Sequence, residues 1–287
     1  MRKARAFCPG HVTAFFEVCR TRDPLSTGSR GAGICLSLGA TSEVTFSEAS
    51  GRSIEVTLDG RPVRAPVTVD AVSRLLGDRC GAVSVRTRHD LPVGQGFGMS
   101  AAGALSAAFA LASILRESKQ RAFEVAHEAE VLRGGGLGDV AALYRGGVTV
   151  RERPGLPPIG KVRRVPGAPE LVLCVVGRPI RTKTVLSHPG KVRAINSIGG
   201  RLVDEMLKRP SVSTLMELAN DFALASGLAT KRVLRAIKAA SAHGVASMAM
   251  LGNSVFAVGD VDALDEVLSA CGRTYRCNVD VAGPRTV

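Results

Sequence analysis

Aromatic residues are scarce in this chain. It contains no Trp, two Tyr and nine Phe among 287 residues, so that aromatic side chains make up 4% of the sequence. Proteins that bind single-stranded nucleic acid commonly stack the bases on exposed aromatic rings. The composition therefore argues against a stacking platform for single strands.

Acidic residues are few relative to basic ones. Thirty-eight Lys and Arg face twenty-five Asp and Glu, which leaves a net charge of +13 and a pI near 10.0. This balance suits an anionic partner: nucleic acid, acidic lipid or a phosphorylated small molecule. The charge alone does not choose among these partners.

Paired cysteines are absent. The seven cysteines are an odd number, are scattered along the chain and include no CxxC pair. Cys271 and Cys277 are close to each other, but no His follows at a zinc-binding spacing. The sequence therefore predicts reduced thiols, a cytoplasmic location and no structural metal.

Long uncharged runs are also rare. Phe97–Leu115 is one, with nineteen residues, which is long enough to consider a membrane span. It opens in a glycine cluster and consists chiefly of Ala, Gly and Ser, so we expect a buried central helix and no membrane partner. At the N-terminus, Pro9-Gly10-His11 follows the basic start before any apolar core forms, which argues against a signal peptide.

Hydrophobic periodicity predicts an α+β protein of two domains. Strands are expected at 42–47, 54–58, 82–87, 147–150, 171–176 and 254–258, with a hairpin turn at Asp59-Gly60. Helices are expected at 100–116 and 121–133, after Asp139, and around the apolar stripes that contain Leu215, Val233 and Leu264. Five prolines between Pro154 and Pro169 mark the best boundary, so we expect domains at 1–155 and 156–287.

The strongest local signal is the segment Leu91-Pro-Val-Gly-Gln-Gly-Phe-Gly-Met-Ser-Ala-Ala-Gly-Ala-Leu105. It predicts a strand, a loop with Gly94, Gly96 and Gly98, and a helix that begins near Ser100. Glycines allow close approach of the backbone to an anion, and free N–H groups at a helix start bind phosphate. The loop is neither a Walker A motif, which ends in Gly-Lys-Ser/Thr, nor a dinucleotide-binding fingerprint. Phosphate binding is favoured over a purely structural turn.

The second signal combines a helix with a glycine turn. His127 and Glu130 are three residues apart and share one helix face, and Asp139 follows Gly134-Gly135-Gly136-Leu137-Gly138. Simple helix capping is the alternative for Asp139. A solvated helix face is the alternative for Glu124, Glu128 and Glu130. The phosphate-binding loop nearby favours a catalytic role for some of these carboxylates.

These segments resemble the GHMP kinases. Pro92–Ala102 is similar to the ATP-binding motif of that superfamily, Cys8–Val12 to its first motif, and Ala249–Val255 to a depleted form of its third, glycine-rich motif. Within the superfamily, Pro9–Phe16, Asp23–Gly33 and Gly136–Val140 look like the archaeal pantoate kinase family.

The resemblance implies a two-domain fold. The N-terminal GHMP kinase domain would contain a left-handed βαβ crossover like that of ribosomal proteins, and the C-terminal domain would be ferredoxin-like. It also implies ATP and Mg²⁺ as cofactors, pantoate as the substrate and 4-phosphopantoate, on the archaeal route to coenzyme A, as the product. Two departures stand out: Met99 replaces a Ser of the second motif, and His11 stands where mevalonate kinases have Lys.

The resemblance further assigns roles to particular residues. The implied catalytic residues are Ser100, Glu130 and Asp139, of which Ser100 and Glu130 would hold the metal. The implied ATP-binding residues are Pro92, Gly94, Gly96, Gly98, Ser100 and Ala101. The implied substrate-binding residues are Ser29, His127 and Arg151.

Two alternatives remain at this point. One is another small-molecule kinase of the same superfamily, of the homoserine or mevalonate type. The other is a basic RNA-binding protein, against which the ordered kinase motifs argue because RNA binding requires neither Glu130 nor Asp139. We expect no nucleic-acid partner, and the sequence leaves the oligomeric state open, a homodimer included.

Overall fold

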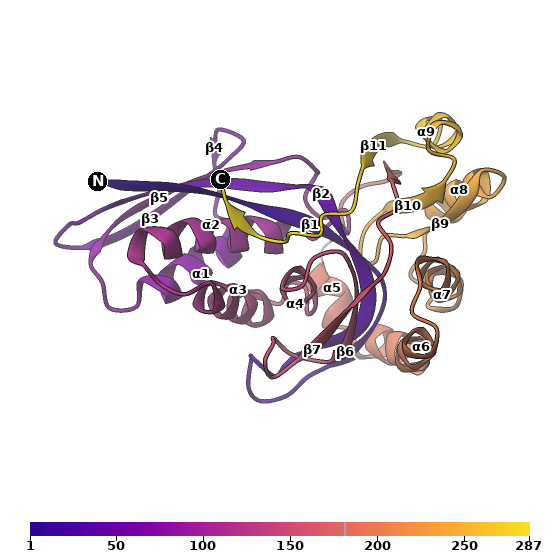
Figure 1. The fold of residues 1–287 in the computed structure, drawn as a ribbon, viewed down its shortest axis with the longest axis horizontal. Coiled ribbons are helices and arrows are strands. Elements are labelled where there is room, and N and C mark those ends of the chain that lie inside the picture. The colour runs from indigo at the N-terminus through magenta and orange to yellow at the C-terminus, as the bar shows by residue number, and fades with distance from the viewer. Residues whose placement is uncertain (181) are drawn as a thin grey trace.

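Two β-sheets with helices packed against them form the molecule (Figure 1). The computed structural model describes residues 1–180 and 182–287. The strands are β1 (Arg2–Cys19), β2 (Gly28–Ser47), β3 (Arg52–Leu58), β4 (Arg61–Pro62), β5 (Gly81–His89), β6 (Val148–Arg153), β7 (Lys161–Val165), β8 (Leu171–Val175), β9 (Gly244–Met248), β10 (Ser254–Gly259), β11 (Arg273–Cys277) and β12 (Arg285–Thr286). The helices are α1 (Pro66–Leu76), α2 (Met99–Leu115), α3 (Lys119–Arg133), α4 (Asp139–Leu143), α5 (Thr182–Leu186), α6 (Pro189–Lys208), α7 (Val212–Ala225), α8 (Lys231–Ala240) and α9 (Val261–Ser269).

The larger sheet is built on one long hairpin. β1 and β2 pair antiparallel from Arg2↔Phe46 to Cys19↔Gly28, and the sheet order is β12-β1-β2-β5-β3-β4, with β6 also on β2 and β7 on β6. No strand was predicted at β1, because Pro9-Gly10-His11 reads as a break. The strand accommodates these residues with a register shift between Pro9 and Gly10, where β2 contributes two extra residues.

Helices α1, α2 and α3 cover one face of this sheet (Figure 1). α2 is buried along nearly its whole length, and its many Ala residues let it lie close to β1 and β2. The prediction of a buried central helix here is confirmed. No helix in the described part of the chain is long and apolar enough to cross a membrane.

The segment β3–β4–α1–β5 contains the crossover that the resemblance implies. β3 and β5 are parallel neighbours in register from Arg52↔Gly81 to Leu58↔Thr87, and α1 lies between them in sequence. A parallel pair requires such a crossover connection. The left-handed sense of this crossover stays a prediction.

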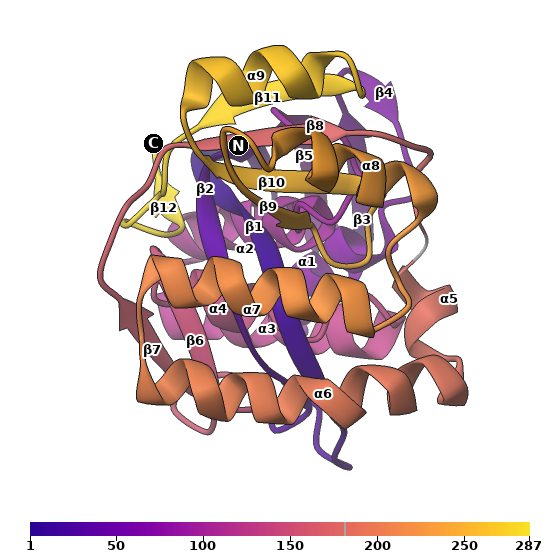
Figure 2. The ribbon, with the colours of Figure 1, turned by 90° about the vertical axis from the view of Figure 1, so that its right-hand side faces the viewer.

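The smaller sheet has the ferredoxin-like order. Its antiparallel strands are arranged β11-β8-β10-β9, and helices separate β8 from β9 and β10 from β11. Figure 2 shows α6 and α7 side by side in front of β1 and β2, so that the second half of the chain also packs on the first hairpin. The predicted α+β fold with two sheets is confirmed.

The strands on either side of the expected boundary at 155/156 show how the two halves are connected. β7 follows that boundary in sequence but pairs with β6 in the larger sheet, and β12 returns from the second half to pair with β1. We therefore propose that the division between the domains lies after Val165, where the loop with Pro166 and Pro169 leads to β8.

Candidate active site

A cavity of about 520 Å³ lies where the two halves meet. Residues from several regions line it: β1, the start of β2, the start of α1, the glycine loop with the start of α2, the end of α3 with the turn to α4, and the segments around α5 and residue 250. Among the predicted site residues, those that line the cavity are Ser29, Gly94, Gly96, Gly98, Ser100, Ala101, Glu130 and Asp139. Pro92, His127 and Arg151 lie outside this lining.

The glycine loop leads directly into α2. Gly94, Gly96 and Gly98 have φ angles of 77°, 78° and 64°, which L side chains rarely adopt. Gly98 precedes the first residue of α2, and no side chain caps the helix. Ser100, in the first turn, is exposed, whereas Ala101 is buried. The uncapped N–H groups and the hydroxyl of Ser100 are therefore available to an anion in the cavity.

The depleted third glycine motif, Ala249–Val255, packs against this loop. A Cβ added at Gly252 would lie 2.1 Å from the carbonyl of Gln95, and one at Gly96 would lie 2.8 Å from the carbonyl oxygens of Ala249 and Met250. The hydroxyl of Ser254 donates to the carbonyl of Gln95. The sequence left the role of Gly252 open; in the structure it permits two backbone segments to touch.

Glu130 and Asp139 converge on the glycine turn between their helices. A Cβ added at Gly136 would lie 2.8 Å from both Glu130 Oε1 and Asp139 Oδ2. The backbone N–H of Gly136 donates to Glu130 Oε1 at 3.2 Å. Glu130 is 2% exposed, so burial raises its pKa well above the ordinary value, and the charge of Asp139 adds to that rise. A divalent cation would relieve the repulsion between these two carboxylates.

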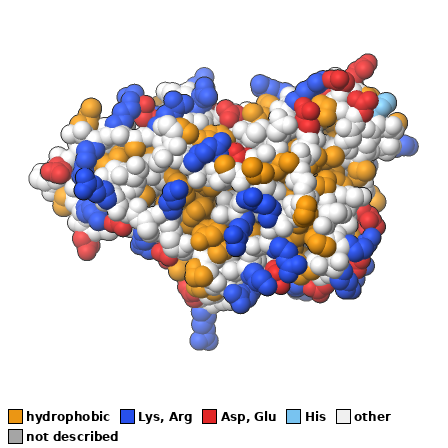
Figure 3. Space-filling view, in the orientation of Figure 1, with side chains coloured by type: hydrophobic (Ala, Val, Ile, Leu, Met, Phe, Trp, Pro, Cys, Tyr) orange, Lys and Arg blue, Asp and Glu red, His pale blue; other side chains and the backbone are white. Residues whose placement is uncertain are grey.

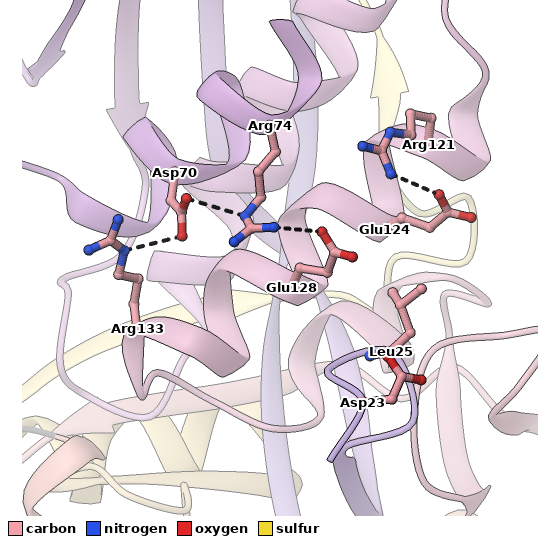
Figure 4. A network of polar contacts seen from close by, with 8 residues as sticks. All are labelled: Asp23, Leu25, Asp70, Arg74, Arg121, Glu124, Glu128 and Arg133. Atoms are coloured by element: carbon pink, nitrogen blue, oxygen red, sulfur yellow. Dashed lines mark hydrogen bonds and ion pairs between the residues drawn. The ribbon is translucent and has the colours of Figure 1, made fainter. Parts of the chain in front are cut away.

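The side chain of Glu128 leaves α3 in a different direction from that of Glu130. Figure 4 shows its carboxylate turned toward α1, where it pairs with Arg74 at 3.0 Å. Arg74 also pairs with Asp70, which pairs with Arg133, so a chain of ion pairs joins α1 to α3. Glu128 thus lies in a contact between two helices, away from the cavity, and it is not a freely solvated carboxylate.

His11, on β1, contacts the catalytic region directly. Its Nδ1 lies 2.7 Å from Asp139 Oδ1, and the imidazole is fully buried. Burial lowers the pKa of His11, with a smaller contribution from the charge of Arg151, although the Asp139 carboxylate opposes this shift. The sequence identified His11 only as a departure from the superfamily and did not predict this contact.

Arg151 is a buried cation beside the two carboxylates. It is 1% exposed, and its three guanidinium nitrogens have no hydrogen-bond partner within the described part of the chain. Burial lowers the pKa of Arg151 to about 10, while the charges of Asp139 and Glu130 oppose that shift. A Cβ added at Gly138 would lie 2.4 Å from Ser29 Oγ and 2.6 Å from Arg151 Nε, so both groups meet this turn. A buried, unpartnered guanidinium fits a small carboxylate ligand.

His127 lies on the far side of Ser29. It is 1% exposed, its Nε2 is 3.0 Å from the carbonyl of Thr27, and its Nδ1 has no partner within the described residues. Burial lowers its pKa, so the ring is neutral near pH 7. The contact with Thr27 places His127 behind the strand that carries Ser29.

Lys183, on α5, is a cavity residue that the sequence analysis did not identify. It lines the cavity opposite the glycine turn, and its side-chain carbons would be 3.3 Å from a Cβ at Gly134. No motif surrounds it in the sequence, and only the tertiary structure brings it against Gly134 at the end of α3.

The residues present fit a magnesium nucleotide. Mg²⁺ commonly takes one or two protein oxygens together with phosphate oxygens and water. The cavity offers the Ser100 hydroxyl and the Glu130 carboxylate, beside helix N–H groups suited to phosphate. No group of three or more His, Cys, Asp or Glu that could hold a metal occurs among the described residues, so phosphate oxygens would complete the coordination.

Comparisons with known proteins identify the family to which the chain is similar. Residues 64–147 match the family model "GHMP kinases N terminal domain". The chain is 37% identical to a pantoate kinase of Thermococcus kodakarensis over 261 residues, which cover 88% of this chain and 87% of the relative. The solved structure of a "phosphotransferase related to CoA biosynthesis pathway" matches with a TM-score of 0.91 and 33% identity, covering 100% of this chain and 99% of the other. A homoserine kinase from Cytophaga hutchinsonii shares the fold, with a TM-score of 0.74 and 19% identity over 100% of this chain and 98% of its own.

The fold, the glycine loop at the start of α2 and the paired carboxylates define a kinase of the GHMP superfamily. The extent and level of identity place it more narrowly. The chain belongs to the pantoate kinase family.

Proposed function

We propose that this protein transfers the γ-phosphoryl group of ATP to the primary hydroxyl of pantoate and so forms 4-phosphopantoate for archaeal coenzyme A synthesis. Membership of the pantoate kinase family supports this activity. The observation that carries the choice of substrate is the unpartnered guanidinium of Arg151 beside Asp139. Pantoate carries a carboxylate, which suits Arg151, and hydroxyls, which suit Asp139.

Each group has a role in this reaction. Arg151 and Ser29 hold the pantoate carboxylate, and His127 shapes the same end of the site. The N–H groups at the start of α2 bind the phosphates of ATP, which the loop from Pro92 to Ala101 approaches closely. Phosphoryl transfer depends mainly on such positioning and on charge neutralisation.

Asp139 faces the reacting hydroxyl. Its carboxylate orients the primary hydroxyl or accepts its proton while that oxygen bonds to the γ-phosphorus and the bond to the ADP oxygen breaks. Ser100 and Glu130 hold Mg²⁺, which neutralises phosphate charge when it is bound.

The proposal extends to the setting of the protein. All seven cysteines are free, as expected for a reducing cytoplasmic location. Light scattering would test whether the protein forms a homodimer. On the face seen in Figure 3 the basic side chains are scattered among acidic and apolar ones, so this face supports no separate nucleic-acid site.

A substrate screen tests the proposal. ADP release is measured with ATP and Mg²⁺ in the presence of pantoate, homoserine, mevalonate or shikimate, and the product of the pantoate reaction is identified by mass spectrometry. We expect pantoate to be phosphorylated at its terminal hydroxyl, with homoserine and mevalonate far poorer. Faster turnover of homoserine or mevalonate would reassign the enzyme within the superfamily.

A further inference from the structure

His11 lies in a short segment of β1 between two irregularities of the sheet. The register with β2 shifts between Pro9 and Gly10 and again between Thr13 and Phe15. The backbone N–H of His11 donates to the carbonyl of Phe97 at 3.0 Å, which ties the segment to the glycine loop. Bulges re-aim side chains relative to a regular strand. Here the two register shifts flank the segment of β1 that carries His11, whose imidazole reaches Asp139 at the start of α4.

The imidazole has a single polar partner of good geometry. Asp139 Oδ1 is 2.7 Å from Nδ1, whereas the hydroxyl of Thr13 is 3.5 Å away. Nε2 has no partner within the described residues, and a Cβ at Gly33 would lie 2.5 Å from it. The burial that lowers the pKa of His11 favours the neutral ring, which carries one N–H. That hydrogen therefore belongs on Nδ1, where it donates to Asp139.

This contact places the two carboxylate oxygens of Asp139 in different surroundings. Oδ1 accepts from His11, and Oδ2 lies against Gly136 on the side of Glu130. Asp139 is the first residue of the five-residue helix α4, whose N-cap residue Gly138 offers no side-chain hydrogen bond. The hydrogen bond from His11 is thus a main restraint on the direction of this carboxylate.

We propose that His11 is a positioning residue for phosphoryl transfer. As a neutral Nδ1–H donor it fixes Oδ1 of Asp139, so that Oδ2 faces the substrate hydroxyl. It adds no positive charge to the site, unlike the Lys found at this place in mevalonate kinases. The inference rests on the proposed function in one respect: it takes Asp139 as the group that meets the hydroxyl.

Three variants separate positioning from packing. In His11→Asn the amide N–H occupies roughly the place of Nδ1–H, whereas in His11→Gln it reaches the place of Nε2, and His11→Leu has no donor. Loss of a hydrogen bond that orients a catalytic group commonly costs about 10–100-fold in activity. We therefore expect kcat to fall by that factor in His11→Leu and His11→Gln and by less than about threefold in His11→Asn, with KM for ATP nearly unchanged. His89→Asn, at a half-buried His outside the cavity, is the control and should keep the wild-type kcat.

A double-mutant cycle with Asp139→Asn locates the effect. Adding His11→Leu to Asp139→Asn should lower kcat little further, because both changes disable one unit. A normal kcat in His11→Leu, no rescue in His11→Asn, or fully multiplicative losses would each overturn the inference. All variants are assayed with the best substrate from the screen, so a wrong substrate assignment appears in the wild type and leaves this test intact.

A measurement on the wild type covers the case in which the variants do not fold. ¹⁵N NMR of the imidazole should report a neutral ring protonated at Nδ1 between pH 6.5 and 8, because this tautomer alone can donate to Asp139. A ring protonated at Nε2 alone, or at both nitrogens over this range, would overturn the inference.

Discussion

At the scale of single residues, the site is a small group of charges held away from water. Two carboxylates and one guanidinium meet at the turn between α3 and α4, and Glu130 and Arg151 are almost fully buried. Burial raises the pKa of Glu130 and lowers that of Arg151 to about 10, so a nearby opposite charge favours the ionised form of each group. A magnesium nucleotide and a small carboxylate substrate would supply these charges. The buried guanidinium of Arg151 thus predicts an anionic group in one ligand, and the buried carboxylate of Glu130 predicts a cation in the other.

The first prediction compares two carboxylates on the same helix. Glu130→Gln should raise the Mg²⁺ concentration needed for half-maximal rate and cut kcat by about 10²-fold, because one charge is lost at the phosphoryl-transfer site. Glu128→Gln should keep kcat within about threefold and cost less than about 1 kcal/mol of stability, because its pairing with Arg74 is partly exposed. Initial rates against Mg²⁺ concentration, with denaturant unfolding, give both quantities. A large loss of kcat in Glu128→Gln together with a normal kcat in Glu130→Gln would contradict the proposed role of Glu130 as a metal ligand.

The second prediction concerns Lys183. A flexible ammonium at the wall of a phosphate-binding cavity is placed to bind phosphate oxygens. Lys183→Met should therefore lower kcat/KM for ATP by about tenfold or more, the usual scale for one charged hydrogen bond. Lys191→Met, at an exposed residue outside this cavity, is the matched control and should behave as the wild type. Equal activity of the two variants would remove Lys183 from the nucleotide site.

At the scale of elements, the arrangement of loops depends on glycines that let backbones touch. The glycine loop belongs to the first half of the chain, but the segment Ala249–Gly252 of the second half holds it in place. Gln95 strengthens this contact, because its side chain donates to the carbonyl of Gly177 at 2.9 Å. The glycine loop is therefore supported by both halves of the chain.

The third prediction tests this support. Gly252→Ala would place a methyl group 2.1 Å from the backbone of Gln95, so the loop must shift. We expect KM for ATP to rise by about tenfold or more, since small displacements in such sites are costly. Gly51→Ala, at an exposed glycine with no atom within 4 Å of the added Cβ, is the control and should leave KM unchanged. Isothermal titration with a non-hydrolysable ATP analogue would confirm that binding is affected; normal affinity in Gly252→Ala would refute the role of the motif.

At the scale of the whole molecule, burial of titratable groups makes stability depend on pH. His11, His89 and His127 all have their pKa lowered by burial from the ordinary value of 6.5. Below pH 6.5 the unfolded chain therefore binds more protons than the folded one, and the free energy of unfolding falls as the pH falls. These histidines make the fold most stable above their unfolded pKa.

The fourth prediction follows from this linkage. Lowering the pH from 7.5 to 5.5 should reduce the free energy of unfolding, by at most about 1.4 kcal/mol per histidine for each pH unit below 6.5. Urea unfolding at both pH values measures the change. His89→Asn should make the dependence shallower without altering turnover, because His89 lies outside the cavity. Glu130 acts in the opposite sense, because its raised pKa stabilises the fold as the pH falls, so the slope that His89→Asn removes is the direct measure of one histidine's contribution.

Several features of this protein could be predicted from local sequence. The helices α2 and α3 lie within one or two residues of their predicted bounds, and the glycine cluster indicates the loop that precedes α2. The side chain of Thr230 caps α8, as a Thr directly before an apolar helical stripe indicates. Such features depend on residues near one another in the chain, so composition and spacing are sufficient to indicate them.

Other features were decided only by tertiary structure. β1 runs through Pro9 and Gly10 because β2 adapts its register, and Lys183 reaches the cavity because the fold brings it against Gly134, the C-cap residue of α3. The bond from His11 to Asp139 joins residues 128 positions apart. The sequence by itself determined the kinds of element and the class of chemistry, since these depend on local propensity and residue type. Which groups meet, and which are buried without a partner, was decided by the packing of distant segments, because no local pattern records a contact across the fold.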